Sequence, residues 1–230
     1  MYVASSSSAA PADPPTGGPA FLTKREYVAG RLREMIISGE LPAGTRIGQH
    51  QVAEMLHVSP TPVREAIRQL TTEGYFESAP HMGARVADPL HGADLDEVYG
   101  LRATLEGLLA REAAARIAPG NLQHLRQLCA DFAAAVDAGD RRAARLLNYQ
   151  LHHVVWQAAE QPLTLGMVES LWAKFPQVLG RVPERGVRSR EEHASLMSAL
   201  ESRDGDAAEA AVRAHVASGR HELYSQGGTG

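Results

Sequence analysis

From residue 94 onward the chain carries one pattern only, with apolar residues recurring every three or four positions, the period of an α-helix. Glycine or proline, which discourage helix continuation, separates the successive segments. Six helices are predicted, over residues 94–117, 121–138, 140–159, 163–182, 188–202 and 204–224. Because helices without strands must cover one another's apolar faces, we expect this part of the chain to form an all-α bundle.

The segment before this bundle follows a different plan, with short helices and then a hairpin. Three helices are predicted, over residues 23–38, 49–56 and 60–74, and residues 41–45 form a turn. The third helix has a clear start, because Ser59 is a good N-cap and Pro60 suits the first helical position. Two short strands around a Pro- and Gly-containing turn are predicted within residues 75–87. This order is that of a winged helix-turn-helix, so the fold class is mainly α.

Composition limits the class of protein. Hydrophobic residues make up 44% and charged residues 22% of the 230 residues, which is typical of a globular protein with two domains. No run approaches the ~18 apolar residues of a membrane span, and no signal peptide is recognised, so a cytoplasmic location without membrane partners is expected. The lone Cys129 is interpreted as a small buried hydrophobe. The predicted parts are a disordered tail (1–20), a winged helix-turn-helix (21–88), a linker (89–93), a helical domain (94–224) and a flexible tail (225–230).

The second and third predicted helices form a pair suited to the major groove of DNA. On the third helix, Thr61, Arg64 and Arg68 lie opposite an apolar face. Arg64 can donate two hydrogen bonds to a guanine or reach a phosphate, and Ser59 and Thr61 stand close enough to the helix start to contact phosphate. An ordinary helical pair with a solvated charged face carries the same pattern. The net charge of −4 does not favour nucleic-acid binding, so the basic residues must gather on one face.

This region resembles the DNA-binding domain of the GntR family of bacterial transcription regulators. The resemblance is carried by GELPAGTRI at residues 39–47, VAEMLHVSPTPVREAI at 52–67 and EGY at 73–75. It implies that Thr61 and Arg64 contact an operator.

The same resemblance implies roles for the predicted wing and reveals two departures. Gly83 is expected to shape the wing tip, and His81 beside it to enter the minor groove. Pro60 stands where the family usually has arginine, which removes a cation and should alter operator preference or weaken binding. His50 stands where relatives commonly have a basic contact, and its charge at neutral pH depends on its surroundings.

Histidines are the notable polar residues of the helical part. Asn148 and His152 are four residues apart and share a helix face, while His193 and His215 lie in the last two predicted helices. From spacing alone, these can be isolated surface or core histidines. His153 points about 100° away from His152 and is assigned to packing or to a supporting contact.

The helical part also resembles the effector domain of the FadR-type branch of the GntR family, called the FCD domain. The resemblance implies that Asn148, His152, His193 and His215 hold a divalent metal. Three imidazoles and an oxygen suit Zn²⁺ first, with Ni²⁺, Mn²⁺ or Fe²⁺ as alternatives, and leave positions for water or a carboxylate. Aspartate is the more usual residue at position 148, and the amide of Asn148 attracts a cation less strongly.

Arg102 is the candidate effector-binding residue. The pattern Leu-Arg-x-x-Leu-Glu at residues 101–106 resembles a family helix whose arginine commonly faces the ligand cavity. Arg102 is therefore expected to clamp a carboxylate bidentately. The alternative is an Arg102–Glu106 surface pair, worth only a few tenths of a kcal/mol.

These features predict a ligand-responsive transcription regulator. A homodimer paired through its helical domains would read a pseudo-palindromic operator and be released as a repressor by a small carboxylate. Two alternatives stay open, a metal-dependent enzyme acting on a small carboxylate and a metal-free constitutive DNA-binding protein. The enzyme is disfavoured because no acidic residue stands at a metalloprotease-like offset from His152.

Overall fold

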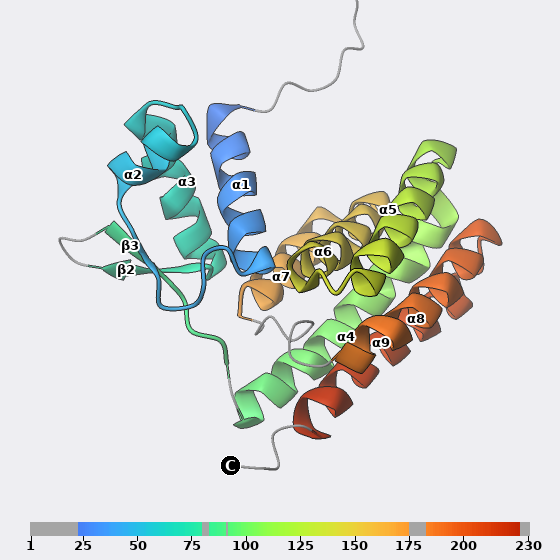
Figure 1. The fold of residues 1–230 in the computed structure, drawn as a ribbon. Helices are drawn as coiled ribbons and strands as arrows, with labels where there is room; N and C mark the ends of the chain where they lie inside the picture. Colours follow the sequence, from blue (N-terminus) through green and yellow to red (C-terminus); the bar gives the residue numbers. More distant parts are fainter. Residues whose placement is uncertain (1–22, 80–82, 91, 175–182, 226–230) are drawn as a thin grey trace, which may run out of the picture.

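The computed structural model describes residues 23–79, 83–90, 92–174 and 183–225, and these form nine helices and three strands (Figure 1). The helices are α1 (Lys24–Ser38), α2 (Gln49–Met55), α3 (Pro60–Glu73), α4 (Gly92–Arg116), α5 (Pro119–Asp137), α6 (Arg141–Ala158), α7 (Pro162–Ala173), α8 (Pro183–Glu201) and α9 (Gly205–Ser225). The strands are β1 (Arg46–Ile47), β2 (Phe76–Ala79) and β3 (Gly83–Val86). The mainly α fold is thus confirmed, and no helix in the described ranges is long and apolar enough to cross a membrane.

The N-terminal unit consists of α1 to α3 and a small antiparallel sheet of order β1-β3-β2. The side chain and backbone of Thr23 form a reciprocal capping box with Glu26 at the start of α1, as a threonine N-cap favours. Apolar residues of α1 and α3 are fully buried against each other, which fixes the two helices as one body. The predicted helix-turn-helix and hairpin are therefore both present.

Gly83 begins β3 in a conformation that a side chain would disturb. Its φ is +88°, and a Cβ atom there would lie 2.3 Å from the carbonyl oxygen of Ile47. That close approach exists because β3 pairs with β1, with Ala84 opposite Ile47. Only glycine fits both the positive φ and the space.

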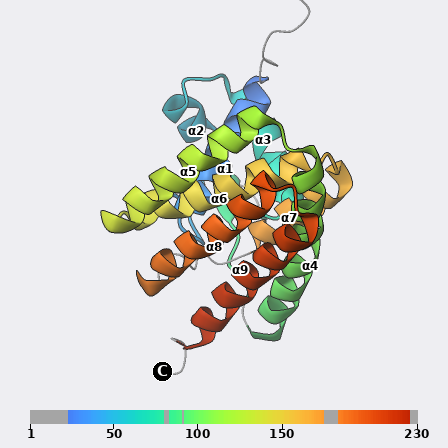
Figure 2. The same cartoon turned by 90° about the vertical axis from the view of Figure 1, so that its right-hand side faces the viewer.

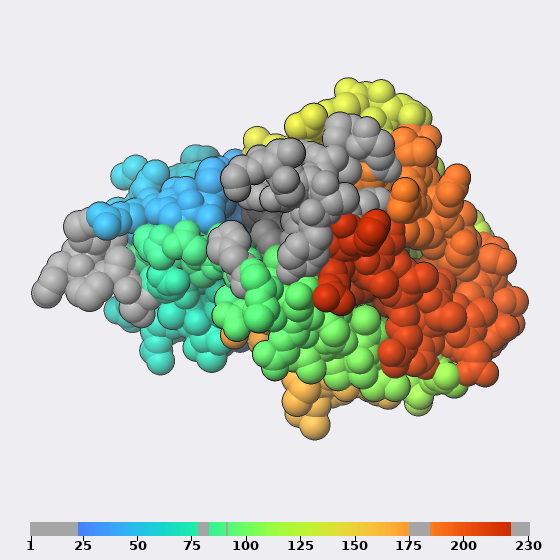
Figure 3. All heavy atoms as spheres, turned by 90° about the horizontal axis from the view of Figure 1, so that it is seen from below, coloured from blue at the N-terminus to red at the C-terminus, as the bar shows by residue number. Residues whose placement is uncertain are grey.

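The C-terminal unit is a bundle of α4 to α9 in which α4 runs along α9, and α5 packs against α6 and α8 (Figure 2). Each helix buries one apolar face, and Leu109, Phe132, Leu151 and Trp156 lie in the interior. The two units occupy opposite ends of the molecule, with the blue and teal residues at one end and the orange and red ones at the other (Figure 3).

The two units are in direct contact along α1 and α6. The Arg145 side chain on α6 donates to the carbonyl oxygen of Ser38, the last residue of α1, with a distance of 3.1 Å from Nε. Arg142 and Glu40 form an ion pair beside it. After the sheet, the amide of Leu90 donates to the carbonyl of Lys174 at 3.2 Å. The N-terminal unit is thus held to the bundle by packing and by hydrogen bonds.

Two expectations about helix boundaries were wrong, and one strand was missed. The helix predicted over 163–182 ends at Ala173, because Pro176 would clash with the preceding turn of a continuing helix. The next helix begins at Pro183 rather than 188, since proline suits the first turn. The short strand β1 was not predicted. The predicted tail over 1–20 lies outside the described residues.

Candidate nucleic-acid interface and metal centre

The outer face of α3 presents the residues predicted to contact DNA. Thr61, Arg64 and Arg68 are exposed, while Val63 and Ile67 on the opposite side are buried. In the described part of the chain, the side chains of Arg64 and Arg68 form no hydrogen bond or ion pair, although the backbone carbonyl of Arg68 accepts from the Thr72 hydroxyl. Both guanidinium groups are therefore available to phosphate or base edges.

The start of α3 leaves donors available to an anion. Ser59 is the N-cap residue by its backbone, as expected, but its side chain makes no capping hydrogen bond. Pro60 and Pro62 have no N–H, so Thr61 carries one of the few amides at this helix end. The exposed Ser59 hydroxyl and the Thr61 amide can both donate to a phosphate.

Of the remaining predicted DNA contacts, His50 and Gly83 lie within the described residues and His81 does not. His50 is exposed in the first turn of α2, and Gly83 lies at the end of the wing that joins β2 to β3. The nearby Arg85 on β3 is occupied, because it pairs with Glu77 at 2.6 Å and Asp88 at 2.9 Å.

Three of the predicted metal ligands meet inside the bundle. His152 comes from α6, His193 from α8 and His215 from α9, and one ring nitrogen of each lies within 4.8 Å of the others. The Nε2 atoms of His152 and His215 are 3.0 Å apart. All three side chains are buried. Helix packing thus brings together residues that are up to 63 positions apart in sequence.

Four buried polar atoms in and beside this cluster have no hydrogen-bond partner among the described residues. They are both ring nitrogens of His193, Nδ1 of His152 and Oδ1 of Asn148. Buried polar atoms without partners are costly, so such a group of lone pairs is expected to receive a cation. The donor set of three imidazoles and one amide oxygen therefore fits a divalent metal such as Zn²⁺.

Burial also keeps the three imidazoles neutral. It lowers the pKa of His193 to about 3, mainly through desolvation and then through the positive charge of Arg185. Desolvation likewise lowers the pKa of His152 and His215 well below the usual range, aided by the other histidines and nearby arginines. Neutral imidazole is the form that binds metals, so the cluster needs no proton release before binding.

A polar network that was not predicted orients His215. Nδ1 of His215 lies 2.7 Å from Glu192 Oε2 and 3.1 Å from an Arg185 nitrogen, and these contacts on Nδ1 turn Nε2 toward His152. Arg185 donates to Glu192 at 2.8 Å, to the Ser218 hydroxyl at 3.0 Å and to the His215 carbonyl at 3.1 Å. Glu192 directly precedes His193, but spacing gave no indication that it would turn toward α9.

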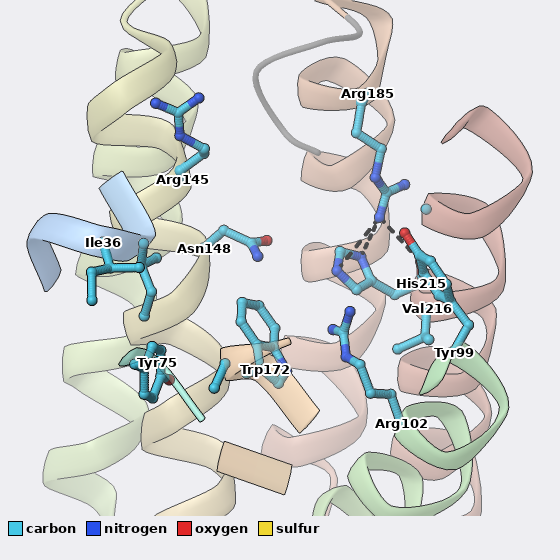
Figure 4. Close-up of a pocket in the computed structure, with 13 residues that line it drawn as sticks. Ile36, Tyr75, Tyr99, Arg102, Arg145, Asn148, Trp172, Arg185, His215 and Val216 are labelled. Atoms are coloured by element: carbon cyan, nitrogen blue, oxygen red, sulfur yellow. Dashed lines mark hydrogen bonds between the residues drawn. The ribbon is translucent and has the colours of Figure 1, made fainter. Parts of the chain in front are cut away.

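A pocket of roughly 700 Å³, its opening to solvent included, lies beside the cluster (Figure 4). His215 and Asn148 line it, and Figure 4 shows the Asn148 amide pointing into the space. Arg102, Arg145 and Arg185 also line it. The site therefore combines three guanidinium groups with the edge of the histidine cluster.

Arg102 is part of this pocket and is not at the surface. Its side chain is buried, its Nε donates to Glu106 Oε1 at 2.7 Å, and its guanidinium lies 4.4 Å from the centre of the Trp172 ring. The alternative of a surface Arg102–Glu106 pair was therefore wrong: the pair exists, but it is enclosed where α7 packs on α4. The sequence pattern marked Arg102 and Glu106 but not Trp172.

Two family models match the chain in the order of its two structural units. The model of the "Bacterial regulatory proteins, gntR family" matches residues 24–86, and the model of the "FCD domain" matches residues 97–218. This chain belongs to the GntR family. It has the FCD effector domain that characterises the FadR-type branch, as the sequence resemblance implied.

Similar proteins match this chain across most of their length. The regulator is 33% identical to the "Probable D-xylose utilization operon transcriptional repressor" of Paenarthrobacter nicotinovorans, over 84% of this chain and 87% of that protein. It is 26% identical to the regulator McbR of Escherichia coli, over 70% of this chain and 73% of McbR. A solved structure of E. coli McbR/YncC has the same fold, with a TM-score of 0.77 and 24% identity, covering 90% and 99% of the two chains.

These matches establish the general function of this GntR-family regulator. It is a ligand-responsive DNA-binding transcription regulator, and the prediction that it is not an enzyme is confirmed by its family. A cluster that can hold a metal is present as three buried histidines.

Proposed function

We propose that this regulator is a homodimeric repressor that leaves its operator when a small carboxylate binds beside a metal in the helical domain. The observation that carries the proposal is the junction of three buried histidines with a pocket lined by Arg102 and Arg185. We assign the DNA-binding domain to residues 21–88 and the effector domain to 94–224, joined by 89–93.

The metal is assigned to His152, His193, His215 and Asn148, with Zn²⁺ as first choice and Ni²⁺, Mn²⁺ or Fe²⁺ as alternatives. An oxygen of the effector would be a further ligand to the ion, which zinc accepts by expanding from four- to five-coordinate. When bound, the ion supplies positive charge for a carboxylate. The guanidinium groups of Arg102 and Arg185 orient the same carboxylate, and the burial of both side chains strengthens these attractions.

Apolar side chains on α4 and α7 support pairing of two chains. Leu101 and Leu108 on α4 are 44% and 41% exposed, and Leu163 and Met167 on α7 are 83% and 59% exposed. Leu101 and Leu108 are two helical turns apart, so they share one face, and α4 and α7 pack against each other. Neighbouring exposed apolar residues are typical of a protein interface. A twofold contact here would place two α3 helices on successive major grooves.

The dimer proposal predicts that Leu108→Glu weakens self-association. A buried carboxylate without a partner is strongly unfavourable, so the dimer dissociation constant should rise at least about tenfold. Sedimentation equilibrium measures it, and Met55→Glu on α2, where the side chain is 42% exposed, is the control. A Leu108→Glu protein as dimeric as wild type would contradict this interface.

The DNA-reading proposal predicts that Arg64→Ala weakens operator binding about five- to 150-fold, since a bidentate base contact is worth ~1 to 3 kcal/mol. The probe is the duplex that wild-type protein selects from a random pool, and fluorescence anisotropy measures the dissociation constant. Arg31→Ala is the matched control, because Arg31 belongs to the same unit but pairs with Glu34 on α1. Equal affinity of Arg64→Ala and wild type would reject α3 as the reading helix.

A further inference from the structure

One wall of the pocket beside the histidine cluster belongs to the DNA-binding unit. Ile36 and Ile37 of α1 and Tyr75, which follows α3, line the pocket together with residues of the helical bundle. All three are buried, with 6%, 6% and 1% of their surfaces exposed. The pocket therefore lies between the two units and not within the bundle alone.

The two sides of this pocket differ in chemistry. Figure 4 shows Arg102, Arg185 and His215 on one side of the pocket and Trp172 in the middle. Ile36 and Tyr75 lie on the other side, where Arg145 and Asn148 also point toward the pocket. The first side presents positive charge and ring nitrogens. The opposite side presents the alkyl surface of α1, and the Trp172 ring continues this surface toward Arg102. A purely polar acid would fill the first side and leave the apolar wall in contact with water, which is unfavourable.

We propose that the effector is an amphipathic acid, with its carboxylate at the arginine side and an apolar group seated directly against α1. This inference rests on the carboxylate site proposed above and adds the class of ligand and its contact with the DNA-binding domain. The pocket thus takes an acid with an aliphatic or aromatic part several carbons long.

Contact with α1 gives such a ligand a direct route to the reading helix. α1 packs against α3 on one side and against α6 on the other. Its C-terminal end is fixed to the bundle by the hydrogen bond from Arg145 to Ser38, and Arg145 itself lines the pocket. An apolar group placed between α1 and the bundle changes the position of α1, and α3 moves with it because the two share one buried core. No relay through other helices is needed.

The test uses the full-length protein loaded with Zn²⁺ and a series of probe acids: acetate, butyrate, hexanoate and octanoate. Isothermal titration calorimetry is expected to show affinity rising about fourfold for each added methylene that becomes buried. In Ile37→Ala the longer acids are expected to lose about tenfold in affinity, while acetate binds as to wild type. Ile67→Ala is the matched control, because Ile67 lies in the same unit with 8% exposure but outside the pocket.

A second variant covers the case in which Ile37→Ala fails to fold. Ala173→Leu adds bulk at the pocket wall and should weaken octanoate at least about tenfold relative to acetate. If all four acids bind with the affinity of acetate, or if Ile67→Ala loses as much affinity for the longer acids as Ile37→Ala, the inference is overturned. The carboxylate site itself would not be affected by either result. Failure of every acid to bind would overturn the carboxylate site and this inference together.

Discussion

Replacing His193 by alanine is expected to lower Zn²⁺ affinity about a hundred- to a thousandfold. A structural zinc site is worth ~10 to 16 kcal/mol over four ligands, so one ligand contributes about 2.5 to 4 kcal/mol. His193 is the best position for this substitution because both of its ring nitrogens are buried without a partner among the described residues. The alanine variant therefore breaks no hydrogen bond of the side chain there. Competition with a chromogenic chelator measures the affinity.

The thermal stability of the same variant gives a second measurement. Zn²⁺ at a hundred times its dissociation constant should stabilise the wild type by about 2.7 kcal/mol and leave His193→Ala almost unaffected. His153→Ala is the control, because its ring contacts Glu169 at 3.1 Å rather than the cluster. If His193→Ala binds Zn²⁺ as tightly as His153→Ala, the histidine cluster is not the metal site; a wild-type protein that binds no Zn²⁺ would be the metal-free alternative.

Gly83→Ala is expected to destabilise the DNA-binding unit by about 3 kcal/mol or more, which is over a hundredfold in the folding equilibrium. A non-glycine residue at positive φ costs ~1 to 3 kcal/mol, and here the added Cβ also meets the Ile47 carbonyl at 2.3 Å. Relief requires β3 to move away from β1, so the wing should lose its register. Urea unfolding followed by circular dichroism measures the change.

Gly30→Ala in α1 is the matched control. Nothing lies within 4 Å of a Cβ built at Gly30, and alanine is favoured over glycine inside a helix by about 0.5 to 1 kcal/mol. Gly30→Ala should therefore stabilise the protein slightly. Comparable stabilities for the two variants would show that the tight β1–β3 approach is not required.

The sequence predicted the elements whose signals are local. α3 begins at the Ser59-Pro60 pair and ends at Gly74, which adopts φ +94° as a C-cap. These features act within one turn of the helix, so they are visible in a single sequence. By contrast, Arg46–Ile47 is too short to show a period, and it becomes a strand only by pairing with β3.

In the candidate site, too, some residues could be found from the sequence, while the roles of others depend on how the helices pack. The candidate metal-ligating histidines were found through a family resemblance, and spacing alone did not separate them from ordinary core residues. Arg185 lies near a break between predicted helices, where no periodic signal marks it, and its role arises only because α8 packs along α9. Tyr75 was interpreted as a strand residue, and its place in the pocket depends on how the two units meet.

The hydrogen bond from Arg145 to the end of α1 also limits how freely the two halves of such regulators can be exchanged. In a chimaera that joined this DNA-binding unit to a helical domain without an arginine at the position of Arg145, the carbonyl of Ser38 would lose its donor, and Ile37 would face a surface to which it is not matched. The operator specificity of this regulator would therefore be changed best by substitutions on the outer face of α3, with the contact between α1 and α6 left unchanged.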